Sequence, residues 1–263
     1  MTDPVAANAE RAQRLRELQV PGDPLVLVNV WDVASARTVA GVPGCQALAS
    51  ASWSIAAAHG FADGEQIPLE LMLAAIERIA AAVELPLSAD LESGFGSGPA
   101  EVAETVARAI AAGAVGANLE DGPRSPADHA AVVAAVRERA GREGVPFVIN
   151  ARSDEYLLGE RRLERAIESG RQYADAGADC IFVPGITDLA EIERLVDALE
   201  LPVNVLGSPA MPSLGELAAA GVGRVSFGPG PLGVASAALA QAAGELLDGG
   251  EYPQELGHRP PAG

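Results

Sequence analysis

The chain has 263 residues, and its hydrophobic content of 49% is enough for one large core. It carries 36 acidic and 18 basic residues, a formal net charge of -18, so its surface repels the phosphates of nucleic acids and anionic lipid headgroups. We therefore expect neither a nucleic-acid nor a membrane partner. The length does not require two domains, because α/β barrels commonly run to about 250 residues.

Two absences narrow the function further. The sequence contains no lysine, so all 18 basic residues are arginine. Schiff-base aldolases and pyridoxal-phosphate enzymes need a lysine amine as covalent nucleophile, so both classes are excluded. The N-terminus shows no basic segment followed by an apolar one, and no apolar run approaches the roughly 18 residues of a membrane span. We expect a cytoplasmic protein.

Short β-rich runs alternate with longer helical patterns along the chain, as in successive βαβ units. After a helical arm at about 5–18, strands are predicted near 25–30, 46–50, 86–90, 115–120, 146–151, 179–183, 202–206 and 223–227. Helices are predicted near 33–41, 69–83, 100–112, 126–140, 160–176, 188–199, 213–220 and 231–247.

This alternation predicts the α/β fold class and a (β/α)8 TIM barrel. We expect a single domain over residues 1–263, with 1–20 as an N-terminal arm and 249–263 as a loose tail rich in proline and glycine. An open doubly wound sheet is the alternative, because periodicity does not show whether the first strand meets the last.

Hydrogen-bonding side chains follow nearly every predicted strand at its carboxyl end, where the active sites of such barrels lie. In chain order they are Asn29, Trp31, Asp32, Ser50, Ser52, Asp90, Glu92, Glu120, Asp121, Asn150, Arg152, Asp154, Asn204 and Ser226. Asp32, Asp121 and Asp154 have an equally good explanation as caps of the helices that follow.

Asp90 and Glu92 lie two residues apart, so on an extended chain both carboxylates project toward the mouth of the barrel. Carboxylates this close repel each other unless a cation or a shared proton separates them. With Glu120 from the next strand they form an all-oxygen set that suits Mg²⁺ or Mn²⁺ better than zinc. Arg152 either presents its planar fork to a substrate carboxylate or enolate oxygen, or simply pairs with Asp90 or Glu120.

The glycine-rich segment GFGSG, residues 94–98, does not match a dinucleotide fingerprint, because its spacing is wrong and the carboxylates before it would repel a pyrophosphate. We expect a mobile lid or a tight turn there. His59, His129 and His258 share no spacing typical of a metal site or a catalytic triad, and we expect all three at the surface.

Taken in order, these segments resemble motifs of the isocitrate lyase and phosphoenolpyruvate mutase family, from about Val28 to Gly244. NVWDVASA resembles the family's Asn-x-Trp-Asp opening, and ADLESGFG is similar to its Asp-x-Asp-Thr-Gly-Tyr-Gly signature. NLEDG resembles its Ile-Glu-Asp segment, and INARSD its Ala-Arg-Thr-Asp segment. Single positions also match: Ser50, Ala51 and Ser52 its carboxylate-binding turn, Asp63 its first metal-site aspartate, and Asn204 its substrate-binding asparagine.

The resemblance implies a homo-oligomer, a dimer or a tetramer, in which the last helix swaps between subunits. It implies a small 2-oxo acid as substrate, bound by Trp31, Ser50, Ala51, Ser52, Arg152 and Asn204. It also implies Mg²⁺, with Mn²⁺ as a substitute, held directly or through water by Asp63, Asp90, Glu92 and Glu120. Arg152, Asp63 and Glu120 are the candidate catalytic residues, with Arg152 neutralising an enolate.

Three departures from the family pattern bear on the reaction. Members that cleave isocitrate or methylisocitrate carry a Lys-Lys-Cys-Gly-His lid whose cysteine acts as acid or base, whereas this sequence reads DGPRSPADH there. Their sixth strand ends in a glutamate, and here it ends in Val183, Pro184 and Gly185. Glu92 replaces their second metal-site aspartate, and its extra methylene would shift the ion or interpose a water.

These departures disfavour isocitrate cleavage and favour cleavage of an oxaloacetate-like acid, which needs no cysteine. A phosphonopyruvate-type reaction at a P–C bond is the nearest enzymatic alternative. A non-catalytic barrel that binds a dicarboxylate is the alternative of another class.

Overall fold

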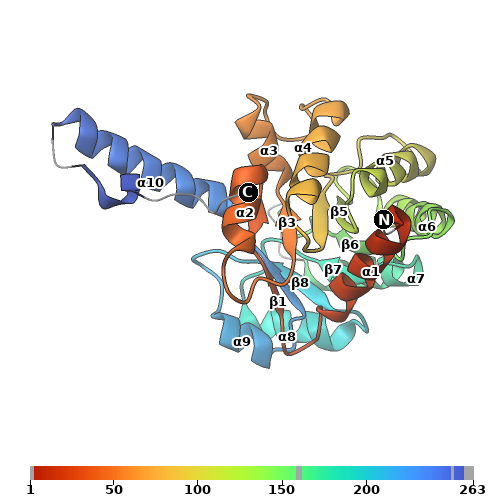
Figure 1. Ribbon diagram of the computed structural model, residues 1–263. Coiled ribbons are helices and arrows are strands. Elements are labelled where there is room, and N and C mark those ends of the chain that lie inside the picture. Colours follow the sequence, from red (N-terminus) through yellow and green to blue (C-terminus); the bar gives the residue numbers. More distant parts are fainter. Residues whose placement is uncertain (1–2, 158–161, 250–251, 258–263) are drawn as a thin grey trace.

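The computed structural model describes residues 3–157, 162–249 and 252–257. Its strands form one parallel sheet in the order β1-β9-β8-β7-β6-β5-β4-β3-β2. β1 (Leu25–Leu27) and β2 (Asn29–Val30) are one strand interrupted at Val28; β1 pairs with β9 and β2 with β3, so the sheet closes on itself. The barrel prediction is confirmed, and the helices surround the closed sheet (Figure 1).

The other strands overlap the ranges predicted from the sequence. They are β3 (Leu48–Ser50), β4 (Leu87–Asp90), β5 (Gly116–Glu120), β6 (Val148–Arg152), β7 (Cys180–Phe182), β8 (Val203–Leu206) and β9 (Arg224–Ser226). Their inward side chains are polar toward the carboxyl ends, and this is where a ligand can be held.

The helices also follow the predicted ranges, with one addition. They are α1 (Pro4–Glu17), α2 (Val33–Ala40), α3 (Ser52–Ala58), α4 (Leu69–Ala82), α5 (Pro99–Ala111), α6 (Pro126–Arg142), α7 (Leu163–Asp175), α8 (Leu189–Ala198), α9 (Leu214–Ala219) and α10 (Gly230–Leu247), followed by a 3-10 helix at Gln254–Gly257. The sequence patterns miss α3, because this seven-residue helix has Ala51 at its N-cap, which offers no side-chain cap. None of the helices among the described residues is both long and apolar enough to span a membrane.

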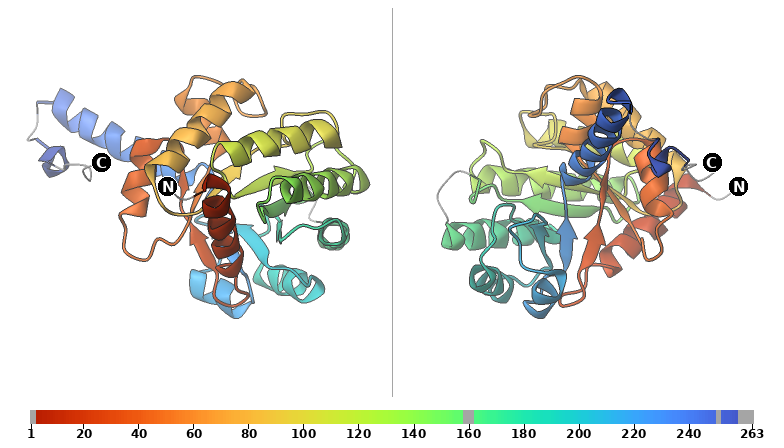
Figure 2. Two further views of the ribbon diagram at one scale, coloured as in Figure 1. Left: turned by 45° about the vertical axis from the view of Figure 1, so that its right-hand side comes forward. Right: turned by 90° about the vertical axis from the view of Figure 1, so that its left-hand side faces the viewer.

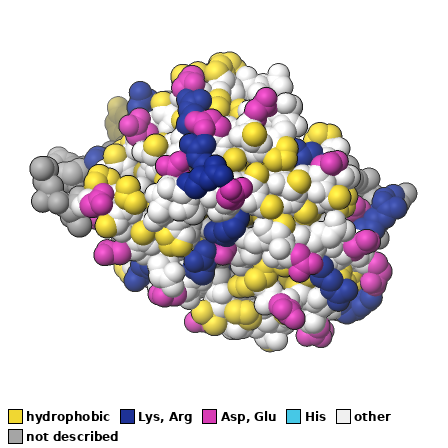
Figure 3. All heavy atoms as spheres, turned by 90° about the vertical axis from the view of Figure 1, so that its right-hand side faces the viewer, with side chains coloured by type: hydrophobic (Ala, Val, Ile, Leu, Met, Phe, Trp, Pro, Cys, Tyr) yellow, Lys and Arg dark blue, Asp and Glu magenta, His cyan; other side chains and the backbone are white. Residues whose placement is uncertain are grey.

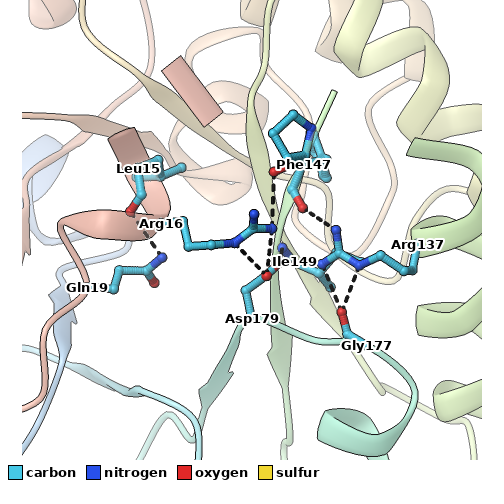
Figure 4. Close-up of polar contacts among 9 residues, drawn as sticks. Leu15, Arg16, Gln19, Arg137, Phe147, Ile149, Gly177 and Asp179 are labelled. Carbon is cyan, nitrogen blue, oxygen red and sulfur yellow. Dashed lines mark hydrogen bonds and ion pairs between the residues drawn. The ribbon is translucent and has the colours of Figure 1, made fainter. Parts of the chain in front are cut away.

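α1 packs at the amino ends of the strands, opposite the mouth. Its Leu15 is fully buried and lies so close to Gly116 that an added Cβ there would be 2.9 Å from Leu15 Cδ2. Arg16 Nε donates to Asp179 Oδ1 at 3.0 Å, Arg137 pairs with the same carboxylate, and the backbone N–H of Ile149 donates to Asp179 Oδ2 at 2.7 Å (Figure 4). Asp179 therefore links α1, α6 and two strands at the base of the barrel.

The outer surface mixes both charge signs where helices meet. On the face shown in Figure 3, arginine and acidic side chains are interspersed with apolar ones. Arg139 joins Glu104 across α5 and α6 at 2.5 Å, and Arg108 joins Glu70 across α4 and α5 at 2.6 Å. Exposed pairs of this kind contribute little each, so the closed sheet and its core carry the fold.

α10 behaves differently from the other helices, because it projects away from the barrel (Figures 1 and 2). None of the side chains described for it is buried, and Val234 and Leu239 are 73% and 72% exposed. A swap of this helix between subunits stays a prediction.

Candidate active site

A pocket of about 180 Å³ opens at the carboxyl ends of the strands. Its polar wall consists of Asn29, Ser52, Asp63, Asp90, Asn118, Arg152 and Ser226. Its other wall is mostly apolar and consists of Ala51, Trp53, Leu157, Phe182, Pro184, Leu206, Gly228 and Pro229. Five of the residues expected in the site, Ala51, Ser52, Asp63, Asp90 and Arg152, thus line one cavity.

The turn between β3 and α3 holds Asp90 in place. Asp90 Oδ2 accepts hydrogen bonds from the backbone N–H and the hydroxyl of Ser52, both at 2.9 Å. Ser50 is fully buried, and its Oγ accepts from the backbone N–H of Asp90 at 2.9 Å. Asp90 Oδ1 is buried without a partner. The serines therefore orient this carboxylate and leave its second oxygen available to a ligand.

Glu92 does not lie on an extended chain, which corrects the expected geometry. Its φ is +51°, in the left-handed region, because the backbone turns immediately after β4 and the N–H of Gly94 donates to the carbonyl of Leu91 at 2.8 Å. Its side chain is buried, with Oε2 accepting from the N–H of Glu65 at 2.6 Å and Oε1 unpartnered. Burial, with Asp63 and Asp90 nearby, raises the pKa of Glu92 to about 7.

Arg152 pairs with Glu120, as the structural interpretation of this residue expects; it also lines the pocket, and its contact with a substrate stays a prediction. Its Nη1 lies 2.6 Å from Glu120 Oε2, and its Nε lies 2.5 Å from Asp154 Oδ1. Burial raises the pKa of Glu120 to about 8 despite Arg152, because further carboxylates surround it. One arginine thus leaves this group of acidic side chains short of positive charge.

The fit of a metal ion can be judged from these oxygens. Among residues 3–157, 162–249 and 252–257, no three His, Cys, Asp or Glu side chains are grouped closely enough to hold an ion by themselves. A direct cage of Asp63, Asp90, Glu92 and Glu120 is therefore not assembled among these residues, because Glu92 accepts from the N–H of Glu65 and Glu120 pairs with Arg152. Coordination through water, the other expected mode, stays a prediction. Mg²⁺ commonly uses one or two carboxylates and keeps several waters. Asp90 with its free oxygen, and Asp63 in the same pocket, fit that mode.

Besides Ser50, which orients Asp90 from beneath and does not line the pocket, two more of the expected substrate residues lie outside the pocket lining. Trp31 is half-buried and packs against the core, and Trp53 lines the pocket instead. Asn204 is fully buried inside the barrel, where its Nδ2 donates to Ser226 Oγ at 3.3 Å. Neither of them reaches the pocket, although Ser226 does.

Glu65 and Arg124, which sequence reasoning missed, hold the glycine-rich turn from both sides. Glu65 Oε1 accepts from Ser93 Oγ at 2.6 Å and from the N–H of Phe95 at 2.8 Å. Arg124 donates to the carbonyls of Ser93 and Gly96, both at 2.7 Å. The structure thus shows a tight turn at GFGSG. The available signal was Arg124 itself, the one cation in DGPRSPADH, the segment where proteins that cleave isocitrate or methylisocitrate carry the cysteine lid.

Asp121 and His129 form a second buried polar group behind β5. Asp121 is not a helix cap; it accepts from the N–H of Asp154 at 3.0 Å and from the hydroxyl of Tyr173 at 2.8 Å. His129 is fully buried, contrary to expectation, with its ring 4.7 Å from that of Tyr173 in an edge-on arrangement. It lies on the inner face of α6, a face that its spacing from the other histidines does not reveal. His258 lies outside the described residues.

Known proteins similar to this chain agree with the motifs. The family model described as phosphoenolpyruvate phosphomutase matches residues 15–247. The uncharacterized protein Rv1998c of Mycobacterium tuberculosis is 31% identical over 91% of both chains. The crystal structure of a putative phosphonomutase from Burkholderia cenocepacia is 44% identical, with a TM-score of 0.86 over 92% of this chain and 100% of that one.

A further solved structure carries a ligand in its name. It is oxaloacetate acetylhydrolase in complex with the product oxalate, 28% identical, with a TM-score of 0.85 over 98% of this chain and 93% of that one. The barrel, the ordered motifs and these similarities agree. The chain therefore belongs to the phosphoenolpyruvate mutase/isocitrate lyase superfamily and is an enzyme of the class that acts on C–C or P–C bonds.

Proposed function

We propose that the chain is a Mg²⁺-dependent lyase that cleaves a C–C bond of a small, oxaloacetate-like 2-oxo acid through an enolate intermediate. One observation carries the proposal. Arg152 and Asp90, whose Oδ1 has no partner among the described residues, line the same cavity at the mouth of the barrel. A cation site beside an arginine fork is the arrangement that stabilises a developing enolate.

The chain's own residues divide the work. Arg152 would exchange part of its pairing with Glu120 for the substrate's carboxylate or enolate oxygen, which its planar fork matches. Asp90 and Asp63 would hold Mg²⁺, with Glu92 and Glu120 acting through water. When bound, Mg²⁺ would polarise the 2-oxo group. Asp63 and Glu120, whose pKa values burial raises, would move a proton to or from the substrate.

The size and lining of the pocket support a small substrate. Its volume of about 180 Å³ is below the roughly 300–1,000 Å³ of common ligand pockets, so a six-carbon tricarboxylate fits poorly. The end of β7 contributes Pro184 and no charged group. Among the described residues Arg152 is the one cation in the lining, which suits a carboxylate better than the more highly charged phosphonate of a P–C substrate.

Turnover of a panel of acids tests the proposal. Oxaloacetate, phosphonopyruvate and isocitrate are incubated with Mg²⁺ and products are followed by NMR. We expect C–C cleavage of oxaloacetate or a close analogue, loss of cleavage in Asp90→Ala, and normal rates in Glu104→Gln, which alters an exposed carboxylate on α5. Product from phosphonopyruvate alone would move the assignment to P–C chemistry. Tight binding of oxaloacetate with no product from any acid would leave a dicarboxylate-binding barrel.

A further inference from the structure

Arg224, at the start of β9, is the feature of the barrel interior that the site described so far does not use. Its side chain is fully buried, with 0% exposure. Nη2 lies 3.2 Å from Ser88 Oγ and 3.3 Å from Asn118 Oδ1, two neutral partners, and Nε and Nη1 are buried with none. Burying a cation with so few bonds costs folding free energy, so its presence calls for a function.

The contact with Asn118 connects Arg224 to the pocket. Arginine has only N–H donors, so the atom of the Asn118 amide that faces it must be the oxygen. Asn150 Nδ2 donates to the same oxygen at 2.5 Å, which fixes the amide from a second side. Asn118 lines the pocket and keeps 7% exposure. Its Nδ2, with two hydrogens to donate, is therefore the end of the amide left for a ligand.

The positive charge of Arg224 also connects this residue to the pocket. Asp90 pairs with Asn118 in the register of β4 and β5, and it lies near enough to Arg224 to interact electrostatically. Ser226, two residues beyond Arg224 on β9, lines the same pocket. Arg224 thus places a positive charge beneath the pocket, where no acidic side chain pairs with it directly among the described residues.

We propose that Arg224 is a positioning residue for ligand binding: it holds the Asn118 amide with Nδ2 directed at an oxygen of the bound acid and supplies positive charge beneath the pocket. The ligand class rests on the proposed function. On this proposal Arg224 lowers the stability of the fold and raises the affinity for the ligand, because its buried charge serves ligand binding.

Oxalate with Mg²⁺, a planar mimic of an enolate, serves as the probe in calorimetry of the full chain. Arg224→Met and Asn118→Ala should each weaken oxalate binding by about tenfold or more, as expected when a hydrogen bond to a charged group is lost. The double variant should lose less affinity than the two single losses added together, because Arg224 acts in part through Asn118. Arg224→Met should melt at the same temperature as the wild type or higher, since an apolar side chain of similar length replaces an unpaired cation.

A matched control separates this role from a structural one. Arg137→Met removes an arginine at the base of the barrel that pairs with Asp179, and it should lower the melting temperature while oxalate affinity stays unchanged. If Arg224→Met does not fold, Arg224→Gln keeps an N–H donor for Asn118 and should show a smaller loss of affinity. Oxalate binding by either Arg224 variant within about twofold of the wild type would overturn the proposal.

Failure of the proposed function gives a different result. If the wild-type chain does not bind oxalate with Mg²⁺, the 2-oxo acid assignment fails, and the positioning role is judged from a crystal structure of Arg224→Met. An Asn118 amide that turns away from its wild-type orientation supports the role. An unchanged amide refutes it.

Discussion

Three charged side chains with unpaired buried atoms lie at or near the pocket: Asp90 lines it, and Glu92 and Arg224 lie close to Asp90. Asp90 and Glu92 each keep an oxygen without a partner, and Arg224 keeps two nitrogens. Asp121, by contrast, sits behind the sheet with its oxygens bonded to Asp154 and Tyr173. Leaving buried charge unpaired costs several kcal/mol. We therefore interpret the unpaired atoms near the pocket as groups that a bound acid and a bound cation would pair.

At the residue scale His129 gives a prediction about pH. Burial lowers the pKa of His129 to about 4, against about 6.5 in the unfolded chain, so the unfolded state binds a proton first as pH falls. The free energy of unfolding is therefore not reduced by His129 above pH ~6.5. It falls as the pH drops from there toward ~4, by about 3 kcal/mol in total. Urea unfolding at several pH values should show a shallower acid slope for His129→Phe than for the wild type.

His59→Phe is the control for that experiment, because His59 is exposed on the loop after α3. It should keep the wild-type slope. Identical slopes for all three proteins would mean that His129 binds its proton equally well in the folded and unfolded states.

The position of each site residue in the fold explains whether the sequence could predict it. Asp90 and Arg152 end their strands, so the parallel topology alone brings them to one mouth. Glu92 departs from the prediction because the turn begins one residue earlier than an extended chain would allow. Arg224 gives no signal, since nothing in GRVSF shows that its side chain points inward beneath the pocket.

At the element scale we predict that the glycine-rich turn requires glycine at position 94. Its φ is +103°, and an added Cβ would lie 2.4 Å from Val102 Cγ1, a buried atom of α5. Gly94→Ala should therefore lower the free energy of unfolding by about 2–4 kcal/mol, from backbone strain and overpacking together. Gly44→Ala isolates the strain, because Gly44 has a φ of +93° and open space around it. It should cost about 1 kcal/mol, and equal losses in the two variants would argue against the contact with Val102.

The base of the barrel gives the second prediction at this scale. Asp179 neutralises two arginines from α1 and α6 and also accepts from β6. Asp179→Asn leaves both cations without their anion and should lower the free energy of unfolding by about 3 kcal/mol. Glu138→Gln, in an exposed pair with Arg142, should change it by less than about 0.5 kcal/mol. Guanidinium unfolding measures both, and a loss in Asp179→Asn as small as in the control would show that α1 docks through its buried apolar side chains, Ala12 and Leu15, and not through Asp179.

Helices were predictable where a capping residue marks their first turn. Helices such as α2, α6 and α9 begin at Asp32, Ser125 and Ser213, whose side chains accept from the third residue of the helix. α3 has no such signal and was missed. The break at Val28 was also invisible, because it depends on how the first strand meets both neighbours across the closing edge of the barrel.

At the scale of the whole molecule the barrel closes on itself and leaves α10 outside. This helix runs from Gly230 to Leu247 and projects from the body in Figure 1 and in the left view of Figure 2. Large apolar side chains exposed along one element usually mark a contact with another chain. We therefore expect a dimer or tetramer in which α10 packs on a neighbouring subunit.

Sedimentation of the full chain tests this assembly. The wild type should sediment as a dimer or tetramer. The double variant Val234→Glu with Leu239→Glu should sediment as a smaller species, because the interface would have to bury two charges. In the single chain these positions are 73% and 72% exposed. Val42→Glu makes the same change at a 56% exposed position on the barrel after α2 and should leave the assembly intact. A wild-type chain that stays monomeric at micromolar concentration would mean that α10 folds back onto its own barrel or remains free.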